Sequence, residues 1–432
     1  MKLFNYLIAT CLFLFSSSVL AHTGIQSSSP ANGAKLSEAP KTIDLRFKGP
    51  VRLLKIEMKG SDGNLIDFPP LASDADPRKN FSLPLPDLQT SAYKVSWMIA
   101  GADGHKIKGK LAFKYSDANG TGGDDTVEGE SFMEGGISPW SLGVFLNKLF
   151  LYIALAMTVG GLAALFTLSG YEALQNLPIQ YLIPGCILGI ITASIGFFLQ
   201  VGSFAEMGIA GMWSHDYLPI LWDSGAGQSY RLQLIGWLLV VITAALVWLK
   251  PHISPIYSAL ALIGVFIIAF SFTLTGHTAE APWWVRIALI LHVVTAMWWI
   301  GSLYPLRRAC NVLPSSNLQS LMIEFGQQAM ILVGLLVVVG IGVAYHLEGS
   351  FSNLLFTGHG NILLLKLASV ATILFIAAKH KWRLVPGLTG DQAAGTAQTL
   401  RRSITVEMII GLVILLITAA LSSLVGPASL MA

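Results

Sequence analysis

The chain is poor in charge. Of its 432 residues only 12% are Asp, Glu, Lys or Arg, whereas 53% are hydrophobic. An ordinary soluble protein carries about twice that share of charge, and a disordered chain carries fewer apolar residues. The formal net charge is only +3, which gives no indication of nucleic-acid binding. We therefore expect a membrane protein without a nucleic-acid partner.

Cysteine is also scarce. The three cysteines are Cys11, Cys186 and Cys310, each in an apolar stretch, and none belongs to a CxxC pair. Neither a disulfide framework nor a thiolate zinc site is indicated. The sequence has no Walker motif, which argues against ATP hydrolysis by this chain. We expect that it is not an enzyme.

The first 21 residues are typical of a secretory signal peptide. A basic start at Lys2 precedes an apolar core, and small residues end the segment at Ala21. Cleavage there would make His22 the first residue of the mature chain.

Residues 22–117 have the alternating pattern of short β-strands. Polar and apolar residues alternate in several runs, between prolines and glycines, as in 42–47, 93–97 and 110–115. This period of two predicts a small all-β sandwich or barrel. Residues 118–138 are acidic and rich in glycine, which predicts a flexible linker.

Residues 139–432 predict an all-α polytopic membrane domain of about eight helices. Apolar stretches of spanning length run over 142–168, 180–203, 230–249, 255–275, 284–305, 322–346, 360–379 and 403–425. If residues 22–117 lie outside, the basic residues between these stretches gather at the inner ends, as the positive-inside rule requires.

The histidines fall mainly at the outer ends of these helices. The loop after the second helix carries Met207 and Met212 beside His215 and Asp216. Imidazole and thioether groups suit a soft metal, so this loop is a candidate for metal collection. The alternative is that its methionines and tryptophan are apolar anchors at the membrane interface.

Within the membrane, ionisable residues suggest function. His292 lies nine residues after Trp283, about 13 Å along its helix, where an ionisable group is costly and therefore a functional candidate. With His277 it could form a metal or substrate site. Alternatively, His292 bonds a neighbouring helix and His277 caps a loop. Lys366 and Glu407 are candidates for coupling, although their different depths argue against direct pairing, and packing or headgroup roles remain open.

The strongest candidate metal site in the sequence lies in the β domain. A free His22 would offer its amine and its ring, and Asp103 and His105 project from the same face of an extended segment. Three nitrogens and one carboxylate oxygen form the near-planar set that Cu(II) favours. The alternative is an Asp-Gly turn with an incidental surface histidine.

These residues carry a resemblance. The start His22-Thr-Gly-Ile-Gln-Ser-Ser-Ser-Pro-Ala-Asn-Gly-Ala with the later Asp103-Gly104-His105 is similar to the CopC family of periplasmic copper-binding proteins. The membrane half resembles CopD in Gly276-His277-Thr278, in residues 298–301 and 360–366, and in residues 400–403 with Glu407. The resemblance implies a CopC–CopD fusion.

The resemblance also implies an immunoglobulin-like sandwich with Cu(II) at His22, Asp103 and His105. The methionine-rich segment of some CopC proteins is missing, since Met58 and Met98 are the only methionines in residues 22–117. We therefore expect Cu(II) alone in this domain and Cu(I) as a candidate cargo of the helices.

The expected function is copper transport in the bacterial inner membrane. The β domain would lie in the periplasm, receive copper there, with periplasmic copper chaperones as candidate partners, and pass it inward through the lipid bilayer. One alternative is a haem-binding electron-transfer or metal-reductase protein with His277 and His292 as axial ligands. The other is a binding or sensing protein whose helices serve only as an anchor.

Overall fold

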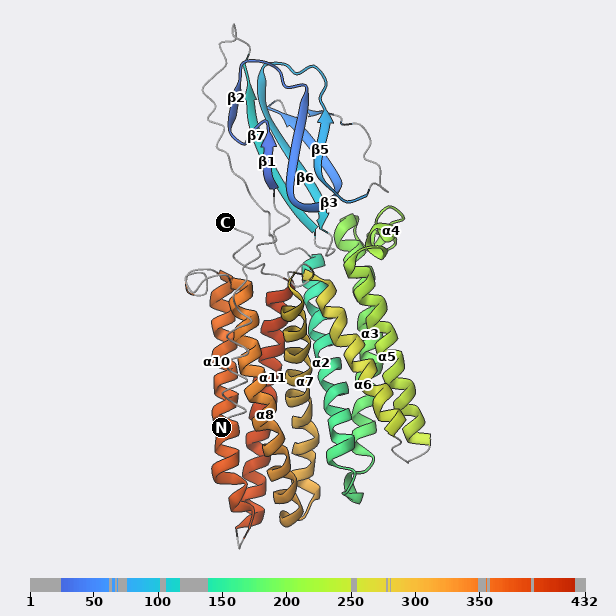
Figure 1. Cartoon of the computed structure of the whole chain (residues 1–432), viewed down its shortest axis with the longest axis vertical. Helices are drawn as coiled ribbons and strands as arrows, with labels where there is room; N and C mark the ends of the chain where they lie inside the picture. Colours follow the sequence, from blue (N-terminus) through green and yellow to red (C-terminus); the bar gives the residue numbers. More distant parts are fainter. Residues whose placement is uncertain are drawn as a thin grey trace.

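The computed structural model describes most of the chain. The described residues are 25–61, 64–66, 68, 76–101, 106–116, 139–249, 255–276, 279, 281–348, 355, 358–389 and 392–423. They form a β domain that stands on one end of a bundle of long helices (Figure 1).

The β domain has seven described strands in one hydrogen-bonded sheet. Its central path runs β1-β3-β6-β7-β2, and β4 and β5 also pair with β3. The strands are β1 (Ile25–Ser29), β2 (Ala34–Leu36), β3 (Thr42–Gly60), β4 (Leu65–Ile66), β5 (Arg78–Pro84), β6 (Ser91–Gly101) and β7 (Lys106–Tyr115).

The long strand β3 connects the two parts of this domain. Its first half pairs with β1 and β5, and its second half pairs with β6. Alternate residues along it are buried from Ile43 to Leu53, because successive side chains of a strand point to opposite faces. The register shifts between Leu53 and Lys55, and the alternation resumes with Ile56 and Met58. They pack in one core with Tyr93, Trp97 and Phe113. The prediction of an all-β domain is confirmed.

Eight long apolar helices follow, as predicted. The candidate spans in the described chain are Pro139–Thr167, Glu172–Ala205, Gly225–Leu249, Pro255–Leu274, Trp283–Val312, Ser315–Tyr345, Gly360–Leu384 and Ala393–Ser423. They correspond to the helices α2 (Pro139–Thr167), α3 (Leu177–Ala205), α5 (Gly225–Leu249), α6 (Pro255–Ser271), α7 (Trp283–Val312), α8 (Ser315–Glu348), α10 (Gly358–Lys379) and α11 (Ala393–Ser423). Each is long enough to cross a bilayer.

Glycines allow the central helices of the bundle to approach closely. A Cβ atom added to Gly301 of α7 would lie 1.9 Å from the carbonyl oxygen of Ala156 on α2. In membranes such contacts replace much of the hydrophobic driving force, because lipid is as apolar as the side chains. The α2–α7 crossing therefore depends on the missing side chain of Gly301.

The basic helix ends lie away from the β domain. In Figure 1 the ends of α5, α7 and α10 and the starts of α6, α8 and α11 lie at the end of the bundle opposite the β domain. The last turns of α7 carry Arg307 and Arg308, and α10 ends at Lys379. Arg307, Arg308 and Lys379 thus lie at the same end of the bundle.

Candidate functional site

The three predicted Cu(II) ligands, His22, Asp103 and His105, lie outside the described residues, but the strands that flank them are described. Strand β1 begins at Ile25, which pairs with Phe47 of β3, and β6 ends at Gly101, which pairs with Val51 of β3. Four residues of a strand span about 13 Å. The start of β1 and the end of β6 therefore lie at the same end of the β domain.

The base of the β6–β7 connection contacts the helical domain. Lys106, the first residue of β7, donates a hydrogen bond to Oε1 of Glu206 at 2.7 Å and another to the carbonyl oxygen of Ser203. Lys108 bonds the second carboxylate oxygen of Glu206 at 3.1 Å. Glu206 caps the end of α3 with a left-handed φ of 53°. Two lysines at the start of β7 thus bond to the end of α3.

Apolar residues complete this contact. Ala100 of β6 is buried in one cluster with Val201 and Phe204 of α3 and with Leu221 of the short helix α4 (Tyr217–Trp222). Leu54 of β3 packs against the same cluster. The contact joins residues about a hundred positions apart in sequence, so no local pattern indicated it.

Burial and charge act in opposite directions at Glu206. Partial burial by itself raises the pKa of this carboxyl, but the hydrogen bonds from Lys106 and Lys108 outweigh burial, so its pKa is lowered. For Lys106 burial is the larger influence and lowers the pKa of its ammonium group, which the bond to Glu206 partly offsets. The described geometry, with two ammonium groups on one carboxylate, favours an ionised Glu206.

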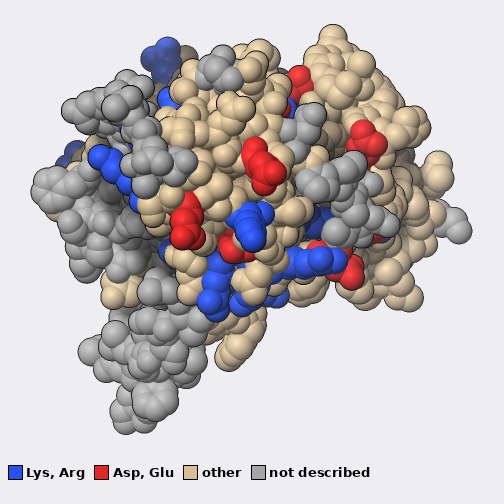
Figure 2. Space-filling model, turned by 90° about the horizontal axis from the view of Figure 1, so that it is seen from above, with Lys and Arg blue, Asp and Glu red and all other residues tan. Residues whose placement is uncertain are grey.

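Charges on the β domain are mixed in sign. Figure 2 shows basic and acidic side chains next to one another on the face seen from above. The pair Lys55–Glu57 is an example, with 2.7 Å between Nζ and Oε1.

The loop predicted to collect metal lies directly beside the docked β domain. It comprises Glu206, the 3-10 helix η2 (Ile209–Trp213) and the residues up to α4. Met207 is 68% exposed, His215 is exposed and Met212 is half-buried. Trp213 stacks on Phe198 of α3, which fits the interfacial-anchor interpretation. In the described part of the chain, no three His, Cys, Asp or Glu side chains meet as a metal-holding group.

His292 lies among three helices. Its Nδ1 is buried and has no hydrogen-bond partner within the described structure. A Cβ atom on Gly340 of α8 would lie 3.3 Å from this nitrogen, so the glycine makes room for the ring. Lys366 of α10 is close enough to act on the imidazole by its charge. Lys366 thus lies in the electrostatic surroundings of His292, while His277 lies outside the described residues.

A second polar cluster lies near the opposite end of the bundle. Glu407 of α11 is almost fully buried, and its Oε1 lies 3.7 Å from Nδ1 of His380. The other ring nitrogen of His380 is 2.7 Å from the hydroxyl of Ser403. Glu407 and Lys366 thus belong to different clusters. The sequence analysis gave His380 no role. The signal available in the sequence was the spacing of Ser403 and Glu407 by one helical turn, which places these two polar side chains on one face of a helix.

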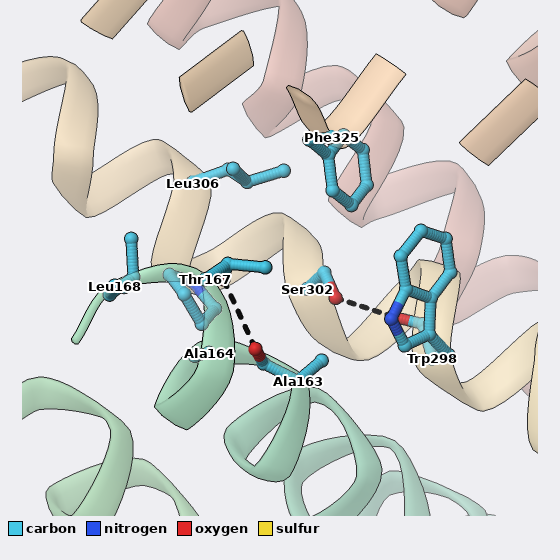
Figure 3. Close-up of a pocket in the computed structure, with 9 residues that line it drawn as sticks. Ala163, Ala164, Thr167, Leu168, Trp298, Ser302, Leu306 and Phe325 are labelled. Carbon is cyan, nitrogen blue, oxygen red and sulfur yellow. Dashed lines mark hydrogen bonds between the residues drawn. The ribbon is translucent and has the colours of Figure 1, made fainter. Parts of the chain in front are cut away.

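The space between α2, α7 and α8 is small and mainly apolar. A cavity of about 10 Å³ is lined by Trp298, Ser302 and Phe325 among others, which is room for at most about one water molecule. Figure 3 shows the hydroxyl of Ser302 bonded back to the carbonyl oxygen of Trp298, at 2.6 Å. The hydroxyls of Thr167 and Ser302 both donate hydrogen bonds within their own helices, so the two polar clusters are the better candidates.

The β domain docked on eight apolar helices defines a multi-pass membrane protein with an extramembrane β domain. Two family models match it: the CopC domain at residues 25–116 and Copper resistance protein D at residues 319–421. The second match contains Lys366, His380, Ser403 and Glu407.

Known proteins extend the comparison to nearly the whole chain. The copper transport protein CutJ of Bacillus subtilis is 24% identical over 449 residues, covering 99% of this chain and 79% of CutJ. Protein YobA of Escherichia coli K12 is 31% identical over 103 residues, covering 23% of this chain and 83% of YobA. Copper resistance protein C of Xanthomonas campestris pv. juglandis is 30% identical over 111 residues, covering 23% of this chain and 84% of that protein.

Among solved structures, CopC from Methylosinus trichosporium OB3b is 25% identical and covers 23% of this chain and 98% of that chain, with a TM-score of 0.20. The matches to both halves identify the family. The chain is a CopC–CopD fusion and belongs to the copper transport and resistance proteins. The names of the copper relatives describe transport and resistance, not an enzyme activity.

Proposed function

We propose that the protein captures Cu(II) with its β domain in the periplasm and moves copper inward across the bacterial inner membrane through its helices. The β domain would bind Cu(II) at the amine and ring of His22 together with Asp103 and His105. Copper chaperones of the periplasm are candidate donors of the metal.

The contact of Lys106, at the start of β7, with the end of α3 is the observation that supports this proposal best. Gly101 and Lys106 bracket the predicted ligands Asp103 and His105, and Lys106 is bonded to the end of α3. A captured ion would therefore be held at the outer end of the helical domain. Met207, Met212 and His215 lie on the loop that continues from the same glutamate, Glu206, so they are candidates for receiving the ion.

The burial of the two β-domain methionines supports the choice of Cu(II). Met58 is 0% exposed and Met98 is 7% exposed, so their thioethers are packed in the domain and not offered to a soft ion. The remaining predicted donors are nitrogen and oxygen, which suit Cu(II).

Within the membrane, His292 is the residue that would carry copper. An imidazole nitrogen without a hydrogen-bond partner is costly to bury, and a bound ion would compensate it. His277, on the segment just before α7, would be the outer ligand. Cu(I) is the form we expect to move, with the reductant supplied from outside this chain.

The first experiment determines the mature N-terminus of the purified protein and titrates it with Cu(II) under EPR. We expect a chain that begins at His22, one tight site with nitrogen hyperfine structure, and loss of that signal in His105→Ala. A different N-terminus, or equal weak binding in both proteins, would exclude the capture site.

The second experiment measures copper uptake by vesicles that contain the full-length protein. His292→Ala should abolish uptake while the EPR signal of the β domain stays unchanged. His252→Ala, at the predicted cytoplasmic side, is the control and should keep wild-type uptake. Uptake by the His292→Ala protein equal to wild type would exclude the membrane site.

A further inference from the structure

The inner end of the bundle holds a polar chain that the copper sites do not use. It consists of Ser403 and Glu407 on α11 and His380 at the end of α10, which we call the inner polar cluster. The three side chains connect in one line, from the Ser403 hydroxyl through Nε2 and Nδ1 of His380 to the Glu407 carboxyl, with distances of 2.7 Å and 3.7 Å.

The local helical structure of α11 and of the turn after α10 brings these three side chains together. Ser403 and Glu407 are four residues apart on α11, so they share one face of the helix. His380 begins a π-helical turn, His380–Leu384, that follows α10. Such turns are rare and frequently occur at functional sites. The wider turn presents the imidazole to α11.

The burial of the cluster is graded. The side chain of Glu407 is 3% exposed and that of His380 is 13% exposed. Oε1 of Glu407 has no hydrogen-bond partner within the described residues, and 3.7 Å is too long for a hydrogen bond to Nδ1. A small approach of the ring would close this gap. The imidazole of His380 is the ionisable group that faces this oxygen.

Neighbouring charges lie mainly on other faces. Residues two positions apart on a helix point in nearly opposite directions, so Arg401 and Thr405 face away from Ser403 and Glu407. Arg307 of α7 donates a hydrogen bond to the Thr405 hydroxyl at 2.9 Å. Arg307 and Arg401 both interact electrostatically with the Cys310 thiol. Lys379, next to His380, is the charge that acts on the imidazole. Within the described residues, a negative Glu407 therefore pairs with no lysine or arginine, and the imidazole of His380 would become its cation on gaining a proton.

We propose that the inner polar cluster is a proton-exchange site that couples copper movement to the movement of a proton. Transfer from the Glu407 carboxyl to Nδ1 leaves a carboxylate and an imidazolium. Loss of the proton on Nε2 through the Ser403 hydroxyl to water restores a neutral ring. Protons are conserved, and no redox partner is needed. The coupling rests on the proposed copper transport, whereas proton binding does not.

Infrared difference spectroscopy tests proton binding without any copper. The full-length protein, in vesicles of phosphatidylethanolamine and phosphatidylglycerol, is recorded before and after a pH step. We expect a carboxylic C=O band that is lost in Glu407→Gln and moves in frequency in His380→Gln and Ser403→Ala. Glu324→Gln, an exposed acid on α8, is the control and should keep the band. A band that Glu407→Gln leaves unchanged would overturn the proposal.

Copper uptake into vesicles loaded with a pH indicator tests the coupling. We expect proton movement with copper in the wild type. Glu407→Gln should slow this proton-coupled copper movement by about a hundredfold, which is the lower end of what a positioned acid–base group contributes. The β-domain EPR signal and the thermal unfolding temperature should match wild type, which separates this result from misfolding. Copper movement without proton movement in the wild type would overturn the coupling. No copper movement at all would instead refute the proposed transport, and the infrared band would still decide on proton binding.

Discussion

Lys106 and Glu206 form an ion pair between the two domains, with 2.7 Å between Nζ and Oε1. Lys106 begins the strand that follows the predicted ligands Asp103 and His105, and Glu206 ends the helix that precedes the methionine-containing loop. The pair therefore connects the predicted site of copper capture to the predicted entrance of the membrane domain.

Removing the charge of Glu206 should loosen this contact. Glu206→Gln is expected to cost about 1 kcal/mol of docking free energy, because the pair is partly exposed and such pairs contribute little each. The measurement is the distance distribution between spin labels at the exposed positions Lys94 and Glu172, which should broaden. Glu57→Gln removes a pair inside the β domain, Lys55–Glu57, and should leave the distribution unchanged. Equal broadening in both variants would refute the role of Glu206.

The same contact should depend on pH. The pKa of Glu206 in the docked protein is below its ordinary value of 4.5, so ionisation stabilises docking above that value. The contribution should be lost as pH falls from about 4.5 through the lowered pKa. The label distances should therefore stay constant from neutral pH down to about 5 and broaden only below that. Broadening that begins near neutral pH would show that another group controls docking.

The α2–α7 crossing should not tolerate a side chain at Gly301. Gly301→Ala places a Cβ atom 1.9 Å from the Ala156 carbonyl oxygen, so the helices must separate. We expect a loss of about 1–3 kcal/mol, typical of overpacking, seen as a lower thermal unfolding temperature in detergent. Gly326→Ala meets no atom within 4 Å and is the control. Equal unfolding temperatures for the two variants would contradict this packing.

Gly340 offers a milder test of the His292 site. Gly340→Ala would place a Cβ atom 3.3 Å from Nδ1 and Cε1 of His292, which shifts the ring by a few tenths of an ångström. We expect slower copper uptake with a nearly unchanged unfolding temperature, because ligand geometry tolerates little displacement. Gly334→Ala on the same helix meets open space and should retain wild-type uptake. If both variants transport equally, His292 does not contact the moving ion.

Part of the candidate site could be predicted from sequence. His292 and Glu407 were candidates because an ionisable residue within an apolar stretch is costly, and both lie within candidate spans. The Cu(II) ligand set remains a prediction, since its residues lie outside the described chain. His380 was missed because it stands near the end of its apolar stretch, among lysines and an arginine, where a solvated histidine is ordinary.

The sequence alone determined the two-part architecture. Apolar runs of spanning length and a period-two pattern are local properties, and solvent or lipid selects helices and strands from them directly. Only the tertiary structure decided which distant residues meet. Lys106 reaches Glu206, and His380 reaches Glu407, because the docking of the β domain and the packing of α10 along α11 place them together. Such contacts depend on the shape of whole elements, and no window of neighbouring residues contains that information.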